Sequence, residues 1–387
     1  GADFRNILDF HKDYPQATII KLEQNYRSTQ TILDAAQAVI TRNEERSDKR
    51  LWTDGAVGTP VTVVECLNEK DEGDFIVREV KGLVRSAAFT GIHSLSDCVI
   101  LYRTNAQSRQ LEETLIRSSI PYKIIGGVKF YDRKEIKDAL AYLRLLLNPS
   151  DWVSFERIIN VPARGIGPKT VMGLREINVP AAVTSLTGVG LLPPKVQQFF
   201  TMMHALKTWH QSGANGDQER PVPIVIEEVL VRSGYREFVK DGSIEGEGRW
   251  ENLQELIGSA EKSATLAEFL EQVALVQDTD ESREADTPNG EFLDGAITLM
   301  TLHGAKGLEF PVVFMAGMEE GIFPHSRSLE DKQQMEEERR LAYVGMTRAM
   351  KRLYLLYAFE RRLFGTSQLN APSRFVGEIP VELTERI

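Results

Sequence analysis

The sequence has little cysteine and no long apolar run. Its 387 residues include two cysteines, Cys66 and Cys98, and each adjoins a strand-like run of Val, Ile and Leu. This pattern predicts two buried thiols in a reducing compartment rather than a disulfide framework. No run approaches the ~18 apolar residues of a membrane-spanning helix, and residues 1–10 do not resemble a signal peptide. A soluble cytoplasmic protein with no membrane partner is the default expectation.

Metal-binding and phosphate-binding patterns are also missing. The six histidines show no spacing such as H-x-x-x-H, and no C-x-x-C pair occurs, so no metal site is predicted. The phosphate loop G-x-x-x-x-G-K-[ST] does not occur either. The net charge of −10 argues weakly against a partner held by bulk attraction. A nucleic-acid groove stays possible, because it depends on where Lys and Arg cluster.

Strand and helix patterns alternate in the first third of the chain, which is typical of a parallel α/β layer. Strands are predicted over 17–22, up to Cys66, over 98–102 and over 122–125. Helices are predicted from a cap at Ser28 or Thr29, over 71–86 and over 106–118.

From about residue 130 to 285 the pattern is helical, as shown by the spacing of Ile136, Leu140, Leu143 and Leu147. Further helices are predicted over 152–160, 168–176, 194–210, 222–239, 250–262 and 265–276. The polar run 278–290 predicts a linker, and residues 176–184 have no clear pattern. Strands then return over 296–300, 312–315 and 353–357, with a helix over 331–347. One α/β domain interrupted by a helical insertion explains this order.

Gln24-Asn25-Tyr26-Arg27-Ser28 is the first segment that suits a ligand. It would follow a strand and precede a helix, where ligands bind at the carboxyl ends of open parallel sheets. Arg27 can pair with phosphate oxygens, and Tyr26 can stack on a base. The alternatives are a structural ion pair for Arg27 and simple packing for Tyr26.

The segment from Thr301 to Phe310 is the second. Gly304 and Gly307 allow a tight turn and a close approach to a ligand. Thr301 and His303 can donate to phosphates, and Glu309 can accept from a sugar hydroxyl. The alternative is a plain glycine-rich turn.

Arg348 comes at the end of the helix predicted over 331–347, directly before a strand. An arginine that reaches a γ-phosphate from such a position is worth ~10³–10⁵ in rate. The alternative is an arginine that neutralises the carboxyl end of its helix. The charged stretch 336–340 predicts a mainly solvated helix face with i,i+4 ion pairs.

Two more segments suit nucleic acid. Gly165-Ile166-Gly167 predicts a helix-hairpin-helix whose amides, with Arg164 and Lys169, bind duplex backbone; the alternative is a plain helix-helix turn. Residues 187–190 are a weaker candidate copy. Arg103 and Asn105 follow the strand 98–102 and can contact a single strand.

In their order, these segments resemble the second half of superfamily 1 DNA helicases of the PcrA/UvrD/Rep type, over nearly the whole chain. The resemblance implies a RecA-like domain, 2A, interrupted by a helical insertion, 2B. The phosphate loop and the Mg²⁺-binding acidic pair of such helicases would lie upstream. The motifs are Gln24-Asn25-Tyr26-Arg27-Ser28-Thr29, Tyr102-Arg103-Thr104-Asn105, Phe130-Tyr131-Asp132-Arg133-Lys134-Glu135, Thr301 to Phe310, and Val344-Gly345-Met346-Thr347-Arg348-Ala349.

The resemblance also implies domain ranges and residue roles. Residues 1–15 would be the tail of the missing first motor domain, 16–127 and 288–387 domain 2A, and 128–287 domain 2B, with Gly126-Gly127 and 278–290 as hinges. ATP with Mg²⁺ would be contacted by Tyr26, Arg27, Gly307, Glu309 and Arg348, of which Arg27 and Arg348 would be catalytic. Single-stranded DNA would be contacted by Arg103, Asn105, Thr301 and His303, and duplex by Gly165, Ile166, Gly167, Lys169 and Thr170.

We therefore expect the C-terminal half of an ATP-dependent 3′–5′ DNA helicase of DNA repair or replication. It would be inactive without its N-terminal half. A rival is a non-enzymatic DNA-binding or adaptor module, against which the combination of Arg27, Glu309 and Arg348 argues. A helicase-nuclease subunit would need an acidic metal cluster downstream, and none occurs before Ile387.

Overall fold

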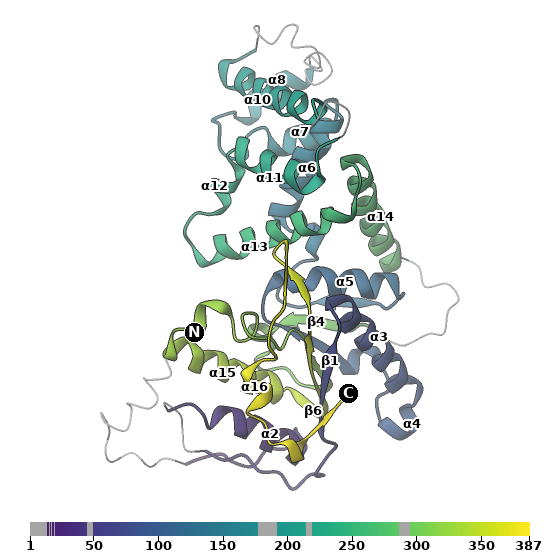
Figure 1. Ribbon diagram of the computed structural model, residues 1–387, viewed down its shortest axis with the longest axis vertical. Coiled ribbons are helices and arrows are strands. Elements are labelled where there is room, and N and C mark those ends of the chain that lie inside the picture. Colours follow the sequence, from purple (N-terminus) through teal and green to yellow (C-terminus); the bar gives the residue numbers. More distant parts are fainter. Residues whose placement is uncertain are drawn as a thin grey trace.

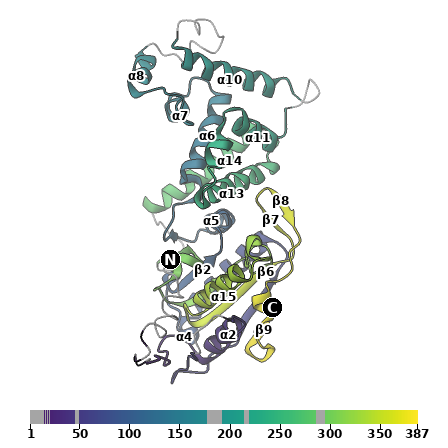
Figure 2. The same cartoon turned by 90° about the vertical axis from the view of Figure 1, so that its left-hand side faces the viewer.

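The computed structural model describes residues 14, 16, 18, 20–44, 49–176, 192–213, 219–285 and 295–387, with the backbone alone for 176 and 281–285. A sheet region and a helical region lie end to end along the long axis (Figures 1 and 2). The chain leaves the sheet region after β3 and returns to it at β4, so the helical region is an insertion, as predicted.

Seven strands form one sheet in the order β3-β4-β2-β5-β6-β1-β9, and every pair is parallel. Strand β4, which follows the insertion, pairs between β3 and β2, which precede it. The strands are β1 (Val61–Cys66), β2 (Cys98–Tyr102), β3 (Tyr122–Ile124), β4 (Ile297–Thr301), β5 (Phe310–Met315), β6 (Ala349–Ala358) and β9 (Thr384–Arg386).

Both faces of the sheet are covered. Along β2, Val99 and Leu101 enter one core and Ile100 and Tyr102 enter the other, because successive side chains of a strand point to opposite faces. A strand buried on both faces is continuously apolar, which made this one recognisable in the sequence. One face packs on α2 (Gln30–Ile40), α15 (Lys332–Met346) and α16 (Arg374–Gly377), the other on α3 (Glu69–Arg85) and α5 (Ser108–Arg117).

The helical region has its own core around α6 (Lys134–Leu147). Ile136, Leu140 and Leu143 are buried there as predicted, whereas Leu147 at the helix end is exposed. Gly234 has a positive φ of 74° and separates two helices where one was expected. The others are α7 (Trp152–Ile158), α8 (Pro168–Glu176), α10 (Pro194–Gln211), α11 (Val222–Arg232), α12 (Tyr235–Val239), α13 (Ile244–Ser259) and α14 (Leu266–Ala285).

A hairpin of β7 (Arg361–Leu363) and β8 (Thr366–Gln368) reaches from the sheet region to α13 (Figure 1). The amide of Phe364 donates to Glu255 Oε2 at 3.2 Å. The hairpin tip and α13 touch through their backbones, since a Cβ placed on Gly258 would be 2.8 Å from the Gly365 Cα. Larger residues would separate the two regions here.

Two expectations are wrong. The described residues of 17–22 form no strand, and Ile20 and Leu22 are 80% and 77% exposed; this short apolar run has no neighbouring strand to bury it. The run 278–290 is helical up to Ala285 because its polar residues before Pro288 include no helix breaker. Residues 177–184 and 187–190 lie outside the described residues, and the four domain ranges stay a prediction.

One charge cluster fastens β7 to the sheet region. Arg361 is 4% exposed and lies 2.9 Å from Glu72 and 2.7 Å from Glu319, both also buried. Burial raises the pKa of Glu72, and the charge of Arg361 opposes that rise. Without Arg361, two carboxylates would stay buried with no cation between them.

We predict that Arg361→Leu lowers the free energy of unfolding by ~3–5 kcal/mol, because breaking a buried ion pair leaves uncompensated charge. The matched control is Arg374→Leu, whose partner Glu320 lies at 2.6 Å in a half-exposed pair. It should cost only ~0–1 kcal/mol. Urea denaturation of both variants measures the difference, and equal losses would contradict a special role for the buried cluster.

Candidate functional site

Arg27, Glu309 and Arg348 lie together at the amino ends of β5 and β6. The Arg27 Nε donates to the Glu309 carboxylate, and its Nη1 lies 3.5 Å from the carbonyl oxygen of Thr347. Ser28 Oγ donates to the carbonyl of Ala349, the first residue of β6, at 2.6 Å. The expectation that Arg27 follows the carboxyl end of a strand is therefore wrong. It is held at the opposite edge of the sheet.

The Arg348 side chain turns back onto carbonyl groups. Its Nε donates to the oxygen of Val344, in the last turn of α15, and its Nη1 to the oxygen of Leu308, both at 3.0 Å. In this structure Arg348 thus neutralises the carboxyl end of its helix. Burial and the positive charge of Arg27 lower the pKa of Arg348, and Glu309 opposes this. One carboxylate between two guanidinium groups leaves an excess of positive charge, which suits an anion.

Tyr26 presents an open aromatic face beside this cluster. Its side chain is 84% exposed, and its hydroxyl donates to Gln24 Oε1 at 2.6 Å. The turn is shaped by Asn25, whose Oδ1 accepts from the amides of Arg27 and Ser28 at 2.8 and 2.9 Å. Such an Asx turn fixes the backbone without using the ring, so the Tyr26 ring remains accessible.

Four residues predicted to contact single-stranded DNA meet at the carboxyl edge of the sheet. Strands β2 and β4 pair in parallel with Tyr102 opposite Thr301, so the residues that follow both strands share one edge. Arg103, Asn105, Thr301 and His303 line one groove of about 870 Å³, whose other wall includes α13. Partial removal from water and the charge of Arg103 lower the pKa of His303, so this ring acts as a neutral hydrogen-bonding group near neutral pH.

Glu338 of α15 fixes the position of Arg103. Its carboxylate accepts from Arg103 Nη2 at 2.7 Å and from Nε at 3.1 Å, and it also accepts from the amide of His325 at 3.0 Å. Glu338 is only 5% exposed. Beyond a run of charged residues, nothing in the sequence indicates this role of Glu338.

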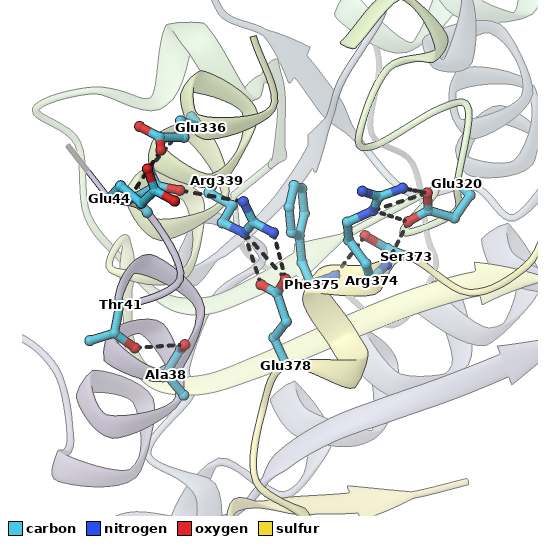
Figure 3. A network of polar contacts seen from close by, with 11 residues as sticks. Ala38, Thr41, Glu44, Glu320, Glu336, Arg339, Ser373, Arg374, Phe375 and Glu378 are labelled. Atoms are coloured by element: carbon cyan, nitrogen blue, oxygen red, sulfur yellow. Dashed lines mark hydrogen bonds and ion pairs between the residues drawn. The ribbon is translucent and has the colours of Figure 1, made fainter. Parts of the chain in front are cut away.

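The expectation of a mainly solvated face over 336–340 is wrong, because α15 is enclosed on two sides. Glu336 is buried beside Glu44, and Arg339 pairs with Glu378 at 2.8 Å on the side shown in Figure 3. An i,i+4 pair of Arg340 with Glu336, at 3.2 Å, is present. These contacts hold the helix that ends just before Arg348.

The segment 302–309 connects the two sites. It leaves the carboxyl end of β4 at Thr301 and enters the amino end of β5 after Glu309. Leu302 and Ala305 anchor its middle in the core, and Gly307 has a φ of 88°, which favours glycine. This short segment therefore has one end at each site.

Buried polar groups join α5 to the start of the helical region. Glu112 accepts from Ser108 Oγ at 2.5 Å and from the amide of Phe130 at 3.0 Å. Arg133 donates to Ser108 Oγ at 2.6 Å and to the carbonyl of Asn105 at 3.0 Å. Burial raises the pKa of Glu112 to about 7, against the charge of Arg133. The junction thus supports the groove loop that carries Asn105.

The predicted duplex-binding hairpin is partly turned inward. Ile166 is 4% exposed, and its amide donates to Asn160 Oδ1 at 3.1 Å. Arg164 donates to the carbonyls of residues 158 and 159 and to the hydroxyl of Tyr142, so it stabilises the helical core instead of adding surface charge. Other members remain at the surface: Gly165, Gly167 and Lys169 are exposed and Thr170 is half-buried.

Features of membrane and metal sites are missing from the described residues. No helix within the described ranges is long and apolar enough to cross a membrane. In the same part of the chain, no three His, Cys, Asp or Glu side chains are grouped as metal ligands would be. Cys66 and Cys98 are free and buried, as predicted.

The family model of the UvrD-like helicase C-terminal domain matches residues 20–186 and 195–360. This chain belongs to that family, which confirms the resemblance seen in its motifs. It is 46% identical to the ATP-dependent DNA helicase PcrA of Bacillus subtilis strain 168, over 100% of this chain and 53% of that relative. The PcrA helicases of Staphylococcus epidermidis and Staphylococcus aureus are each 44% identical with the same coverage. The chain spans about half the length of the curated relatives it matches.

Replacing Glu112 should change how stability depends on pH. Its pKa in the folded state is about 7, above the ordinary 4.5, so the folded state holds this proton more tightly than the unfolded state does. The stabilisation is complete below the ordinary pKa and is lost as pH rises through the folded value. Relative to Glu112→Gln, which stays neutral, the unchanged protein should lose stability between about pH 5 and about pH 8. Urea denaturation measures this difference, which should not be constant with pH.

Proposed function

We propose that this chain is the C-terminal half of an ATP-dependent 3′–5′ DNA helicase that acts in the cytoplasm in DNA repair or replication. The observation that carries the proposal is the connection of two sites through 302–309. A positively charged cluster of Arg27 and Arg348 lies at one edge of the sheet, and a groove lies at the other. Coupling between a phosphate site and a nucleic-acid site is what a motor requires.

The cluster at the amino edge fits a nucleotide. The open ring of Tyr26 is placed to stack on adenine, and Glu309 can accept from a ribose hydroxyl. Arg27 would exchange the Glu309 carboxylate, and Arg348 the carbonyls of Val344 and Leu308, for phosphate oxygens. Both would stabilise charge that develops during transfer. Bound ATP would supply the phosphoryl group. The phosphate loop and the Mg²⁺ ligands would come from the N-terminal half, the main protein partner.

The groove at the carboxyl edge fits a single strand. Arg103, Asn105, Thr301 and His303 present hydrogen-bonding groups along it, which suits contact with phosphates and sugars. The exposed part of the hairpin, with Gly165, Gly167 and Lys169, would contact duplex backbone. Closing and opening of the nucleotide cleft would then shift these contacts relative to those of the other half.

Arg348→Ala tests the catalytic role in the assembled enzyme. ATP binding should stay within a few-fold, because base and sugar contacts remain, while ATP turnover should fall by ~10³ or more. Arg340→Ala is the control on the same helix, since Arg340 pairs with Glu336 and Glu337 of that helix. Steady-state ATPase and nucleotide titrations measure both. Normal ATP turnover in Arg348→Ala would show that Arg348 has no catalytic role.

A mixing experiment separates the motor from an adaptor. DNA-stimulated ATPase is measured for this chain alone and after addition of a separately made N-terminal half. We expect no activity alone and activity on mixing. Silence of the mixture, with binding of DNA retained, would favour a non-enzymatic DNA-binding module and would leave Arg27 and Arg348 with structural roles.

A further inference from the structure

The groove also contains Arg327, whose partners come from the opposite wall. Arg327, in the short helix Ser326–Ser328 of the sheet region, places its Nη2 3.5 Å from Glu247 and 3.6 Å from Glu251 of α13. The ring of His325 lies 3.8 Å from the same Glu251. These pairs cross from the sheet region to the helical region, where α13 is the helix nearest to the sheet (Figure 1).

Arg103 and Arg327 differ in how firmly they are held. Arg103 is bound by Glu338 at 2.7 Å, and that carboxylate is buried. The distances of Arg327 exceed the 2.7–2.9 Å typical of a charge-assisted hydrogen bond, and its side chain is 50% exposed. Water and salt weaken such a pair. Arg327 is therefore a groove cation that can change partners at little cost.

We propose that Arg327, assisted by His325, is a further phosphate-contacting residue of the groove, and that Glu247 and Glu251 hold its place until nucleic acid enters. This rests on the proposed function of the groove. A backbone phosphate that reaches Arg327 replaces the two carboxylates as its partner. The ion pairs of Arg327 with Glu247 and Glu251 are then lost, whereas the buried pair of Arg109 with Glu255 remains. Binding of a strand therefore removes one of the contacts between α13 and the sheet region.

The replacement has a signature in binding measurements. A fluorescently labelled oligothymidine is titrated with this chain at several salt concentrations and followed by anisotropy. The double variant Glu247→Gln, Glu251→Gln should bind several-fold more tightly, because Arg327 no longer has to leave a carboxylate. Arg327→Gln should bind more weakly, and the slope of log affinity against log salt should fall by about 0.7, the value for one phosphate contact on a single strand.

A control on the same helix removes the general effect of charge. Glu245 also lines the groove and is exposed, and among the described residues no ion pair joins it to Arg327 or His325. Glu245→Gln should tighten binding clearly less than the double variant does. When Arg327 is already replaced by Gln, the double variant Glu247→Gln, Glu251→Gln should increase the affinity for the strand no more than Glu245→Gln does.

The outcomes distinguish this inference from the proposed function. Suppose that the unchanged chain binds the strand, but the double variant gains no more affinity than Glu245→Gln does, or gains the same affinity when Arg327 is replaced. The proposed exchange of partners by Arg327 is then wrong, and the helicase proposal stands. If neither the chain nor its mixture with the N-terminal half binds the strand, the groove assignment itself fails. Thermal unfolding of each variant confirms that the surface substitutions leave the fold intact.

Discussion

The parallel pairing of β4 between β3 and β2 is the constraint on which the rest of the structure depends. It joins parts of the chain that flank the whole helical region. It also sets the register that places Thr301 opposite Tyr102, and so creates the groove edge. Strand β5 pairs with β2, and β6 pairs with β5. The same sheet therefore also positions the arginine cluster at the amino ends of β5 and β6. One sheet therefore fixes both sites.

The two sites differ in how they are stabilised. At the groove, Arg103 is fixed by a buried carboxylate from α15, so one contact surface exists before any ligand arrives. At the amino edge, Arg27 and Arg348 are bound to exposed or neutral protein groups that a phosphate can replace. Helix α15 connects these arrangements, since it supplies Glu338 to one and ends beside Arg348 at the other. Under the proposed function, the groove would be a preformed strand site and the arginine cluster an exchangeable phosphate site, as a cycle driven by nucleotide would need.

Much of this was accessible from the sequence. Apolar strands such as 98–102 are recognisable because burial on both faces makes them continuous, and the spacing of Ile136, Leu140 and Leu143 identified α6. The sequence patterns did not predict where residues lie when their position depends on partners far away in the sequence. Arg27 lies at the amino edge because of contacts with β6, and Glu338 is buried because of Arg103. The inward turn of Arg164 likewise depends on carbonyls that only the folded helical core assembles. Local patterns carry no information about such partners.

The place of β4 in the sheet also sets an order of assembly. The sheet is completed only when residues beyond the helical region reach β2 and β3. Such non-local pairing is slow, because the chain loses the entropy of closing a long loop before the strand contacts form and stabilise it. A compact helical region shortens that loop, because its own local contacts bring the ends of the insertion near one another. During synthesis, we expect the helical region to fold first and to bring β4 close to β2 and β3, so that the sheet can be completed.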